Sequence, residues 1–271
     1  MTVATGAGAA RRSGAFGWLG VALLIGVFLL SWGVSLILTA PAGLVRVPAG
    51  MLPGNMTLTP VSGTIWQGQW RLNLPQGDAW AVTARFRPAA LWHGRLDWRI
   101  RVQGDGVSAS ADVSPGWSGV AIDGLTARWA GDAMRLVTAW PMGGRFDGRG
   151  AVYLRRMQQG LMPESGSLSL RWTDAQLTTT EPLTLGTLTL STTLADGGRL
   201  SGRVTPEATS NAPLLGQLDL KGNIHDPQHI RVTGWLQPTS AASPALRQQL
   251  GLLGTTDAQG RIPVNGFLPG A

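Results

Sequence analysis

Strict alternation of apolar and polar residues recurs along most of this 271-residue chain and limits the folds open to it. Residues 96–102 alternate at all seven positions, and residues 80–86, 168–172, 188–194 and 230–233 follow the same period of two. Each run predicts a strand with one apolar face and one polar face. Such one-faced burial is typical of antiparallel sheets.

The segments between these runs contain the residues that tight turns need. Gly104-Asp105-Gly106 and Asp196-Gly197-Gly198 each separate two alternating runs, and glycine supplies the positive φ of short hairpin turns. A Gly-x-Leu pattern also recurs, but at irregular spacing, which excludes a propeller or solenoid period. Its glycines are Gly94, Gly166, Gly186 and Gly216. The strands are therefore predicted to form a hairpin-rich, meandering sheet.

One helix is predicted near the C-terminus, between a capping serine, Ser243, and Gly254. Pro244 suits its first position, and its apolar face comprises Leu246, Leu250 and Leu253. A terminal strand follows at residues 261–267, and Pro263 predicts that it lies at a sheet edge.

The fold class predicted for residues 57–271 is mainly β: an antiparallel, hairpin-rich curved β-sheet or sandwich with one short C-terminal helix. Polar, proline-containing loops are predicted at residues 157–165 and 205–213. The first of these is where the β domain would divide if it has two lobes, and the sequence leaves one lobe or two open.

A long apolar segment, residues 15–38, precedes the strands, and no charged residue lies between Arg12 and Arg46. At about 1.5 Å per residue, a helix of this length exceeds the bilayer core of about 30 Å. Arginines on its N-terminal side predict a cytoplasmic tail at 1–14, a transmembrane anchor at 15–38, a linker at 39–56 and a periplasmic domain at 57–271. In a bacterial protein, this orientation would place the chain in the inner membrane, crossed once. A cleaved signal peptide is the alternative, but its apolar core is shorter, about 7–15 residues.

The residues that usually form catalytic or metal sites are sparse. The chain has no cysteine, which excludes disulfides and thiolate metal sites. His225 and His229 are four residues apart, but Pro227 interrupts them and predicts a turn. Nucleophile-elbow, Walker and dinucleotide motifs are absent. No enzyme, cofactor or metal is predicted, although an exported enzyme that gathers His93 with an aspartate and a serine stays an alternative.

Arginines supply most of the net charge of +7, and five of them occupy polar positions of the predicted strands. These are Arg85, Arg99, Arg101, Arg171 and Arg231. They form either an ordinary solvated face or a surface that attracts anionic headgroups or an acidic partner. No nucleic-acid partner is predicted, because an exported domain seldom meets one.

The tryptophans divide into two groups. Trp80, Trp98 and Trp172 lie at apolar positions of strands, where core packing explains them. Three others, Trp66, Trp70 and Trp235, lie near a glycine-rich turn or on a polar face, and are candidates for contact with a partner.

A short motif near the start of the β domain, Gly63-Thr64-Ile65-Trp66-Gln67-Gly68, resembles one in type II secretion system protein N. Residues 88–96 resemble the stretch of that family that leads into a Gly-x-Leu strand. Residues 252–266 resemble its closing Leu-Gly, Gly-Arg and Gly pattern. The similarity extends from the anchor to Phe267. The motif residues Gly63, Thr64, Trp66 and Gly68, with Trp70 and Trp235, are the candidate site.

This resemblance implies a non-enzymatic accessory subunit of the type II secretion machinery in the inner membrane. Its partners would be other secretion subunits, namely those of the inner-membrane platform and the outer-membrane secretin. The alternative is an AsmA-like envelope protein that handles lipid in an apolar β groove. That alternative predicts an open apolar concave face, whereas a closed two-layer sandwich would count against it.

Overall fold

The computed structural model describes residues 27–29, 31–32, 35–36, 39–44, 56–75, 77–131, 142–157, 160–178 and 182–267. In these ranges, no helix has the length and apolar character to cross a membrane. The predicted tail at 1–14 and most of the predicted anchor at 15–38 lie outside the described residues. The linker prediction at 39–56 is described only at 39–44 and 56, where the short helix η1 spans Ala42–Leu44.

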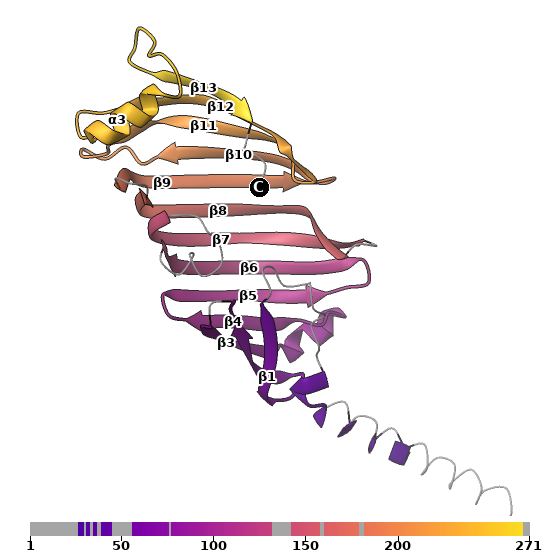
Figure 1. Cartoon of the computed structure of the whole chain (residues 1–271). Helices are drawn as coiled ribbons and strands as arrows, with labels where there is room; N and C mark the ends of the chain where they lie inside the picture. The colour runs from indigo at the N-terminus through magenta and orange to yellow at the C-terminus, as the bar shows by residue number, and fades with distance from the viewer. Residues whose placement is uncertain are drawn as a thin grey trace, which may run out of the picture.

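Thirteen strands form one antiparallel sheet in which the spatial order is the sequence order (Figure 1). The first seven strands are β1 Thr57–Gly63, β2 Gln67–Asn73, β3 Ala79–Phe86, β4 Trp98–Gly104, β5 Val107–Pro115, β6 Gly119–Ala130 and β7 Met142–Met157. The others are β8 Gly160–Thr178, β9 Pro182–Ala195, β10 Arg199–Pro206, β11 Leu214–Asn223, β12 Asp226–Pro238 and β13 Ile262–Phe267. The mainly β, antiparallel prediction is confirmed, and the described residues form a single sheet rather than a sandwich.

The prediction of a loop at residues 157–165 was wrong for most of that range. Strand β8 begins at Gly160, and Pro163 lies opposite Leu154 of β7. The proline is tolerated inside the strand because the register shifts at this point, where one ladder hydrogen bond is already interrupted. The sheet therefore continues through residues 160–165, within the range where the sequence left open a division into two lobes. The second predicted loop is observed from residue 207 to residue 213, between β10 and β11.

One face of the sheet is apolar across its full width. A single row of cross-strand neighbours, called here the apolar row, contains one residue from each strand, and each member lies opposite the next. Its members are Pro60, Trp70, Val82, Val102, Ala109, Ala127, Gly148, Leu170, Leu190, Val204, Leu218, Gly234 and Val264. Because cross-strand pairs are the unit of sheet stabilisation, this row joins all the strands through apolar contact.

The neighbouring row on the opposite face is polar across the same width. It comprises Ser62, Gln69, Thr83, Arg101, Ser110, Thr126, Arg149, Ser169, Ser191, Arg203, Asp219, Thr233 and Asn265. Successive side chains of a strand point to opposite faces. The sheet therefore has an apolar face and a polar face, as the alternation in the sequence predicts.

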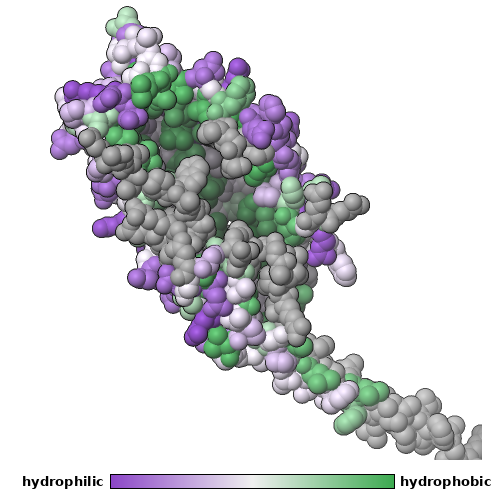
Figure 2. All heavy atoms as spheres, viewed as in Figure 1, coloured by the Kyte–Doolittle hydropathy of each residue, from purple (hydrophilic) through white to green (hydrophobic). Residues whose placement is uncertain are grey.

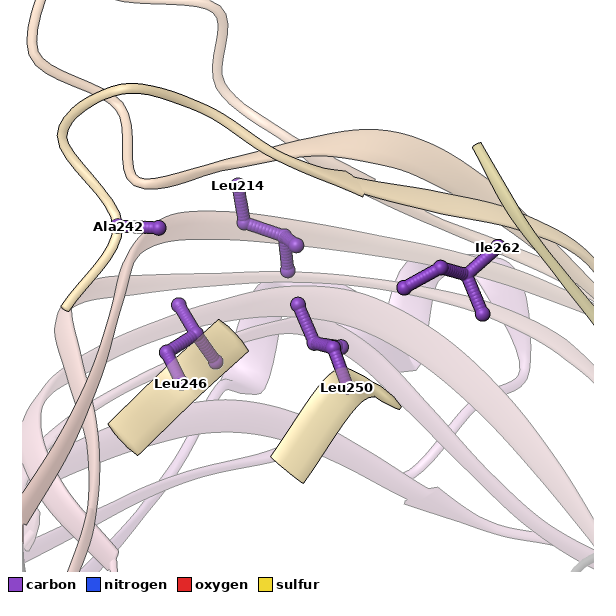
Figure 3. Close-up of a cluster of buried hydrophobic side chains, with 5 residues drawn as sticks. All are labelled: Leu214, Ala242, Leu246, Leu250 and Ile262. Carbon is purple, nitrogen blue, oxygen red and sulfur yellow. The ribbon is translucent and has the colours of Figure 1, made fainter. Parts of the chain in front are cut away.

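Small residues on the apolar face leave room for large ones and allow the sheet to bend toward that side. The ring of Trp129 lies over Gly148, 3.5 Å from the position that a Cβ of Gly148 would take. A Cβ at Gly104 would similarly collide with the ring of Trp80. Glycine in a strand commonly marks such a bend or close approach. Figure 3 shows the strands arching over the side chains that pack on this face.

One helix, α3 (Pro244–Gly251), packs on the apolar face against β9 and β12. The Ser243 hydroxyl accepts a hydrogen bond from the Leu246 amide at 3.2 Å, which confirms the predicted cap. Leu246 and Leu250 pack with Leu214 and Ile262 in the cluster shown in Figure 3. The predicted end of the helix at Gly254 was wrong, because the helix ends at Gly251. Leu253, predicted on its apolar face, is 58% exposed and lies outside the cluster.

We expect Leu246→Ala to lower the free energy of unfolding by about 2–5 kcal/mol, because it opens a cavity between α3 and the sheet. Leu246 is only 2% exposed. The matched control is Leu253→Ala, which should change stability by no more than about 0.5 kcal/mol. Thermal or denaturant unfolding of both variants measures the difference, and equal losses would contradict the described packing of α3.

Candidate functional site

The candidate motif forms the hairpin turn between β1 and β2. Gly63 and Gly68 lie opposite each other, and the Thr64 amide donates to the Gln67 carbonyl at 3.0 Å. The Thr64 hydroxyl accepts from the amides of Trp66 and Gln67, at 3.3 and 3.2 Å. These local bonds are typical of Ser and Thr in turns, and they fix the four-residue bend.

Both glycines of the motif are needed for spatial reasons. Gly63 has a φ of +93°, and a Cβ there would collide with the Gln67 carbonyl. A Cβ at Gly68 would occupy the position of the Trp70 ring. Since Trp70 is 6% exposed, the missing side chain at Gly68 allows the ring to pack against the sheet. Backbone conformation and close packing are therefore sufficient to explain why both positions are glycine.

Trp66 joins an aromatic cluster at this end of the strands. Its ring lies edge-on to Phe86 with centroids 4.7 Å apart, and it stacks parallel to Trp98 at 6.2 Å. The Trp98 indole N–H donates to the Ile65 carbonyl at 3.0 Å, and the Phe86 amide donates to the Trp66 carbonyl at 2.6 Å. Such aromatic pairs are worth about 0.5–1.5 kcal/mol each beyond the area that they bury.

The structure does not bring the three candidate tryptophans together on one surface. Trp70 lies buried on the apolar face, and Trp66 is half-buried at the β1–β2 turn. Trp235 lies on the polar face of β12, opposite Pro263, where the Arg261 guanidinium sits over its ring at 4.5 Å. Trp66 and Trp235 retain accessible surface, and their contact with a partner stays a prediction.

The polar face gathers arginines near the motif hairpin. An open groove across β2–β4 is lined by Gln67, Gln69, Arg85, Arg99 and Arg101, among others. Arg85 lies directly opposite Arg99, a like-charge pair that is unfavourable unless an anion is near. This cationic groove could not be located from the sequence, because its residues come from three strands.

Asp112 of β5 is the anion that balances part of this charge. Its carboxylate accepts two hydrogen bonds from Arg99, both at 2.8 Å, and one from Arg87 at 2.7 Å. The hydrogen bonds from Arg99 lower the pKa of Asp112 against the opposing effect of its burial. Among the described residues, Arg85 and Arg101 have no such partner. The groove therefore keeps an excess of positive charge.

The histidines do not form a metal site with other described residues, which contain no group of three or more potential ligands. His229 pairs with Asp226 at 2.7 Å in the exposed β11–β12 hairpin. His225 lies in the turn that precedes β12, so the predicted strand–turn–strand is confirmed. His93 ends the short helix η3 (Pro88–His93), which lies before β4.

The geometry defines a class of protein: an open, single-sheet β domain with one apolar face, one cationic polar face and a hairpin at its first edge. The family model for type II secretion system protein N matches residues 54–265, and the chain therefore belongs to this family.

Two curated relatives agree with this assignment. The chain is 27% identical to type II secretion system protein N of Aeromonas hydrophila over 265 residues, which covers 89% of this chain and 96% of the relative. It is 26% identical to type II secretion system protein N of Vibrio cholerae serotype O1 over 261 residues, which covers 91% of this chain and 96% of the relative. No solved structure matches the chain.

We expect Gly63→Ala to destabilise the fold by about 1–3 kcal/mol more than Gly77→Ala, because only the first adds a backbone collision. Both glycines have a φ of +93°, but a Cβ at Gly77 would meet nothing within 4 Å. Gly77→Ala thus isolates the conformational cost, about 1–2 kcal/mol. Equal unfolding free energies for the two variants would show that the motif hairpin is not packed as described.

We also expect acid to weaken the fold in part through Asp112. A carboxyl whose folded-state pKa is lowered contributes stability above its unfolded-state pKa of about 4 and loses it as pH falls further. Asp112→Asn should therefore lower the melting temperature at pH 7 and reduce its decline between pH 5 and about 2. Asp105→Asn, in the exposed β4–β5 turn and without an ion pair to the described residues, is the matched control for the loss of one carboxylate.

Proposed function

We propose that this chain is a non-enzymatic accessory subunit of the type II secretion machinery. In this proposal residues 15–38 anchor it in the inner membrane, and its β domain lies in the periplasm against the inner-membrane platform and the secretin. Family membership over residues 54–265 is the observation that carries the proposal. The match extends from β1 into β13, and so includes both faces of the sheet.

The polar face is the better surface for protein partners, compared with the edges of the sheet. Both edge strands contain a proline, Pro60 in β1 and Pro263 in β13, and each removes a ladder donor. Strand addition by a partner is thereby disfavoured. The polar face instead offers Arg85 and Arg101 in an open groove, which suits an acidic partner surface.

The partner surface can be tested by in-cell photocrosslinking of the full-length protein. A photoreactive amino acid at Arg101 or Ser169 projects from the polar face, whereas one at Leu168 projects from the apolar face. We expect platform or secretin subunits to be captured from Arg101 and Ser169, and not from Leu168. Capture of no secretion subunit from the polar-face positions would contradict the proposed contact.

The proposed topology can be tested because the chain contains no cysteine. A single cysteine at Thr2 should stay protected from a membrane-impermeant maleimide in intact cells, whereas one at Ser240 should be labelled once the outer membrane is permeabilised. The reverse pattern would overturn the orientation. If deletion of residues 57–271 left both secretion and assembly of the machinery intact, the proposed role itself would be wrong.

A further inference from the structure

The apolar face beyond helix α3 is only half-covered. Under α3, Leu214 and Ile262 are 5% and 3% exposed. Farther along the same face, the members of the apolar row on β8–β11 are half-buried, and Leu168 beside them is 39% exposed. Among the described residues, no large side chain is fully buried. A sheet that packed on a second layer would bury this row as completely as α3 buries Leu214.

Figure 2 shows the same feature on the surface. Hydrophobic residues lie at the bottom of a hollow on the face that carries α3, and more hydrophilic residues lie along its sides. A contiguous apolar surface of this kind marks a binding site or an interface. The apolar row and its neighbours on the same face, called here the trough, therefore form a candidate binding surface.

The chemistry of the trough favours hydrocarbon over protein. Apart from the indole of Trp70, no side chain of the apolar row contains a nitrogen or oxygen atom. The backbone groups of the strands are used in the sheet ladder, so the trough offers few hydrogen bonds to a partner. Protein interfaces need about one hydrogen bond per 100–200 Å². An acyl chain needs none, and gains from burial alone.

Exposed aromatic and cationic residues gather at one end of the strands, beside this trough. Trp92 in η3 and Trp117 in the β5–β6 turn are 91% and 99% exposed, and Met157 at the β7–β8 tip is 53% exposed. The register places them on one rim, since Trp98 lies opposite Val113 and Gly119 lies opposite Arg155. The two tryptophans, together with the apolar Met157, are called here the aromatic rim.

Arginine accompanies the aromatic rim. Arg155 and Arg156 precede the β7–β8 tip, and Arg199 follows the neighbouring β9–β10 turn. Arg155 pairs with Glu164, whereas Arg156 and Arg199 have no ion pair with the described residues. Tryptophan and arginine together are the side chains that settle at the headgroup layer of a bilayer, where the cations meet anionic phosphates.

We propose that the trough binds acyl chains of membrane phospholipid, which enter across the aromatic rim while it contacts the headgroup layer. The complementarity has two parts: hydrocarbon meets the apolar row, and anionic headgroups meet Arg156 and Arg199 beside the rim. This inference does not depend on the secretion role. It can hold or fail whether or not the polar face binds other subunits.

The test uses full-length protein in nanodiscs of phosphatidylethanolamine and phosphatidylglycerol. A trace of phosphatidylglycerol with a diazirine at the end of one acyl chain is included, and the crosslinked residues are mapped by mass spectrometry. Only crosslinks within residues 56–267 are counted, so that any membrane-embedded segment does not contribute. We expect them on the apolar face, around Leu168, Leu170 and Leu190, and on the aromatic rim.

A matched pair of variants separates the two faces of one strand. Leu168→Glu puts a charge into the trough at an already exposed position, and should lower the crosslink yield at least about fivefold, since a carboxylate must lose water beside the chain. Ser169→Glu, on the polar face, should change the yield less than about twofold. Circular dichroism and the melting temperature establish that both variants are folded.

A second pair tests entry across the rim. Trp92→Ser with Trp117→Ser should slow the appearance of crosslinks in the trough after mixing with diazirine-lipid vesicles, because the rim holds less tightly to the surface. Leu252→Ser, which removes an exposed apolar residue (76% exposed) at the α3 side, should leave that rate unchanged.

Several results would overturn the proposal. Crosslinks confined to the polar face, or equal yields in Leu168→Glu and Ser169→Glu, would exclude the trough as the lipid site. Absence of crosslinks together with a dimer whose contacts map to the apolar row would show that a second copy covers the face. Unchanged kinetics in the tryptophan variant would exclude the rim as the entry.

Discussion

The rest of the structure depends on one constraint: the alternation of apolar and polar side chains stays in register from each strand to the next. Thirteen strands keep apolar residues opposite apolar residues and polar residues opposite polar ones, from Pro60 to Val264 and from Ser62 to Asn265. A slip of one residue in any hairpin would turn every later side chain to the wrong face. Register shifts occur between β5 and β6 and between β7 and β8, where β-bulges accommodate extra residues. The apolar and polar rows nevertheless continue across both strand pairs.

How much of this could be read from the sequence depends on how far apart the interacting residues lie. Alternation at 96–102 and the Ser243 cap are local, and both predicted their elements. Strand β8 could not be delimited, because Pro163 and Gly166 resemble a loop until their partners on β7 are known. Longer-range contacts were equally hidden: Asp112 accepts from Arg99 and Arg87, 13 and 25 positions away.

For the candidate site, the sequence predicted the geometry of the motif better than its purpose. The sequence predicted a glycine-rich turn beside Trp66, and the structure shows it as the hairpin between Gly63 and Gly68. The aromatic stack of Trp129, Phe146 and Trp172 was not foreseen, because three different strands supply it. Family membership then adds the context of secretion, while the two faces offer distinct chemistry, cationic on one side and hydrocarbon on the other.

The meander order has a consequence for how such a sheet is made. Each strand pairs only with its neighbours in the sequence, so no strand waits for a distant partner before it finds its place. Contacts of short sequence separation require little loop closure and form quickly. A chain that emerges with β1 first, as during synthesis, can therefore add one hairpin after another to a growing sheet. Helix α3 is the next-to-last element, and β13 follows it to complete the edge of the sheet.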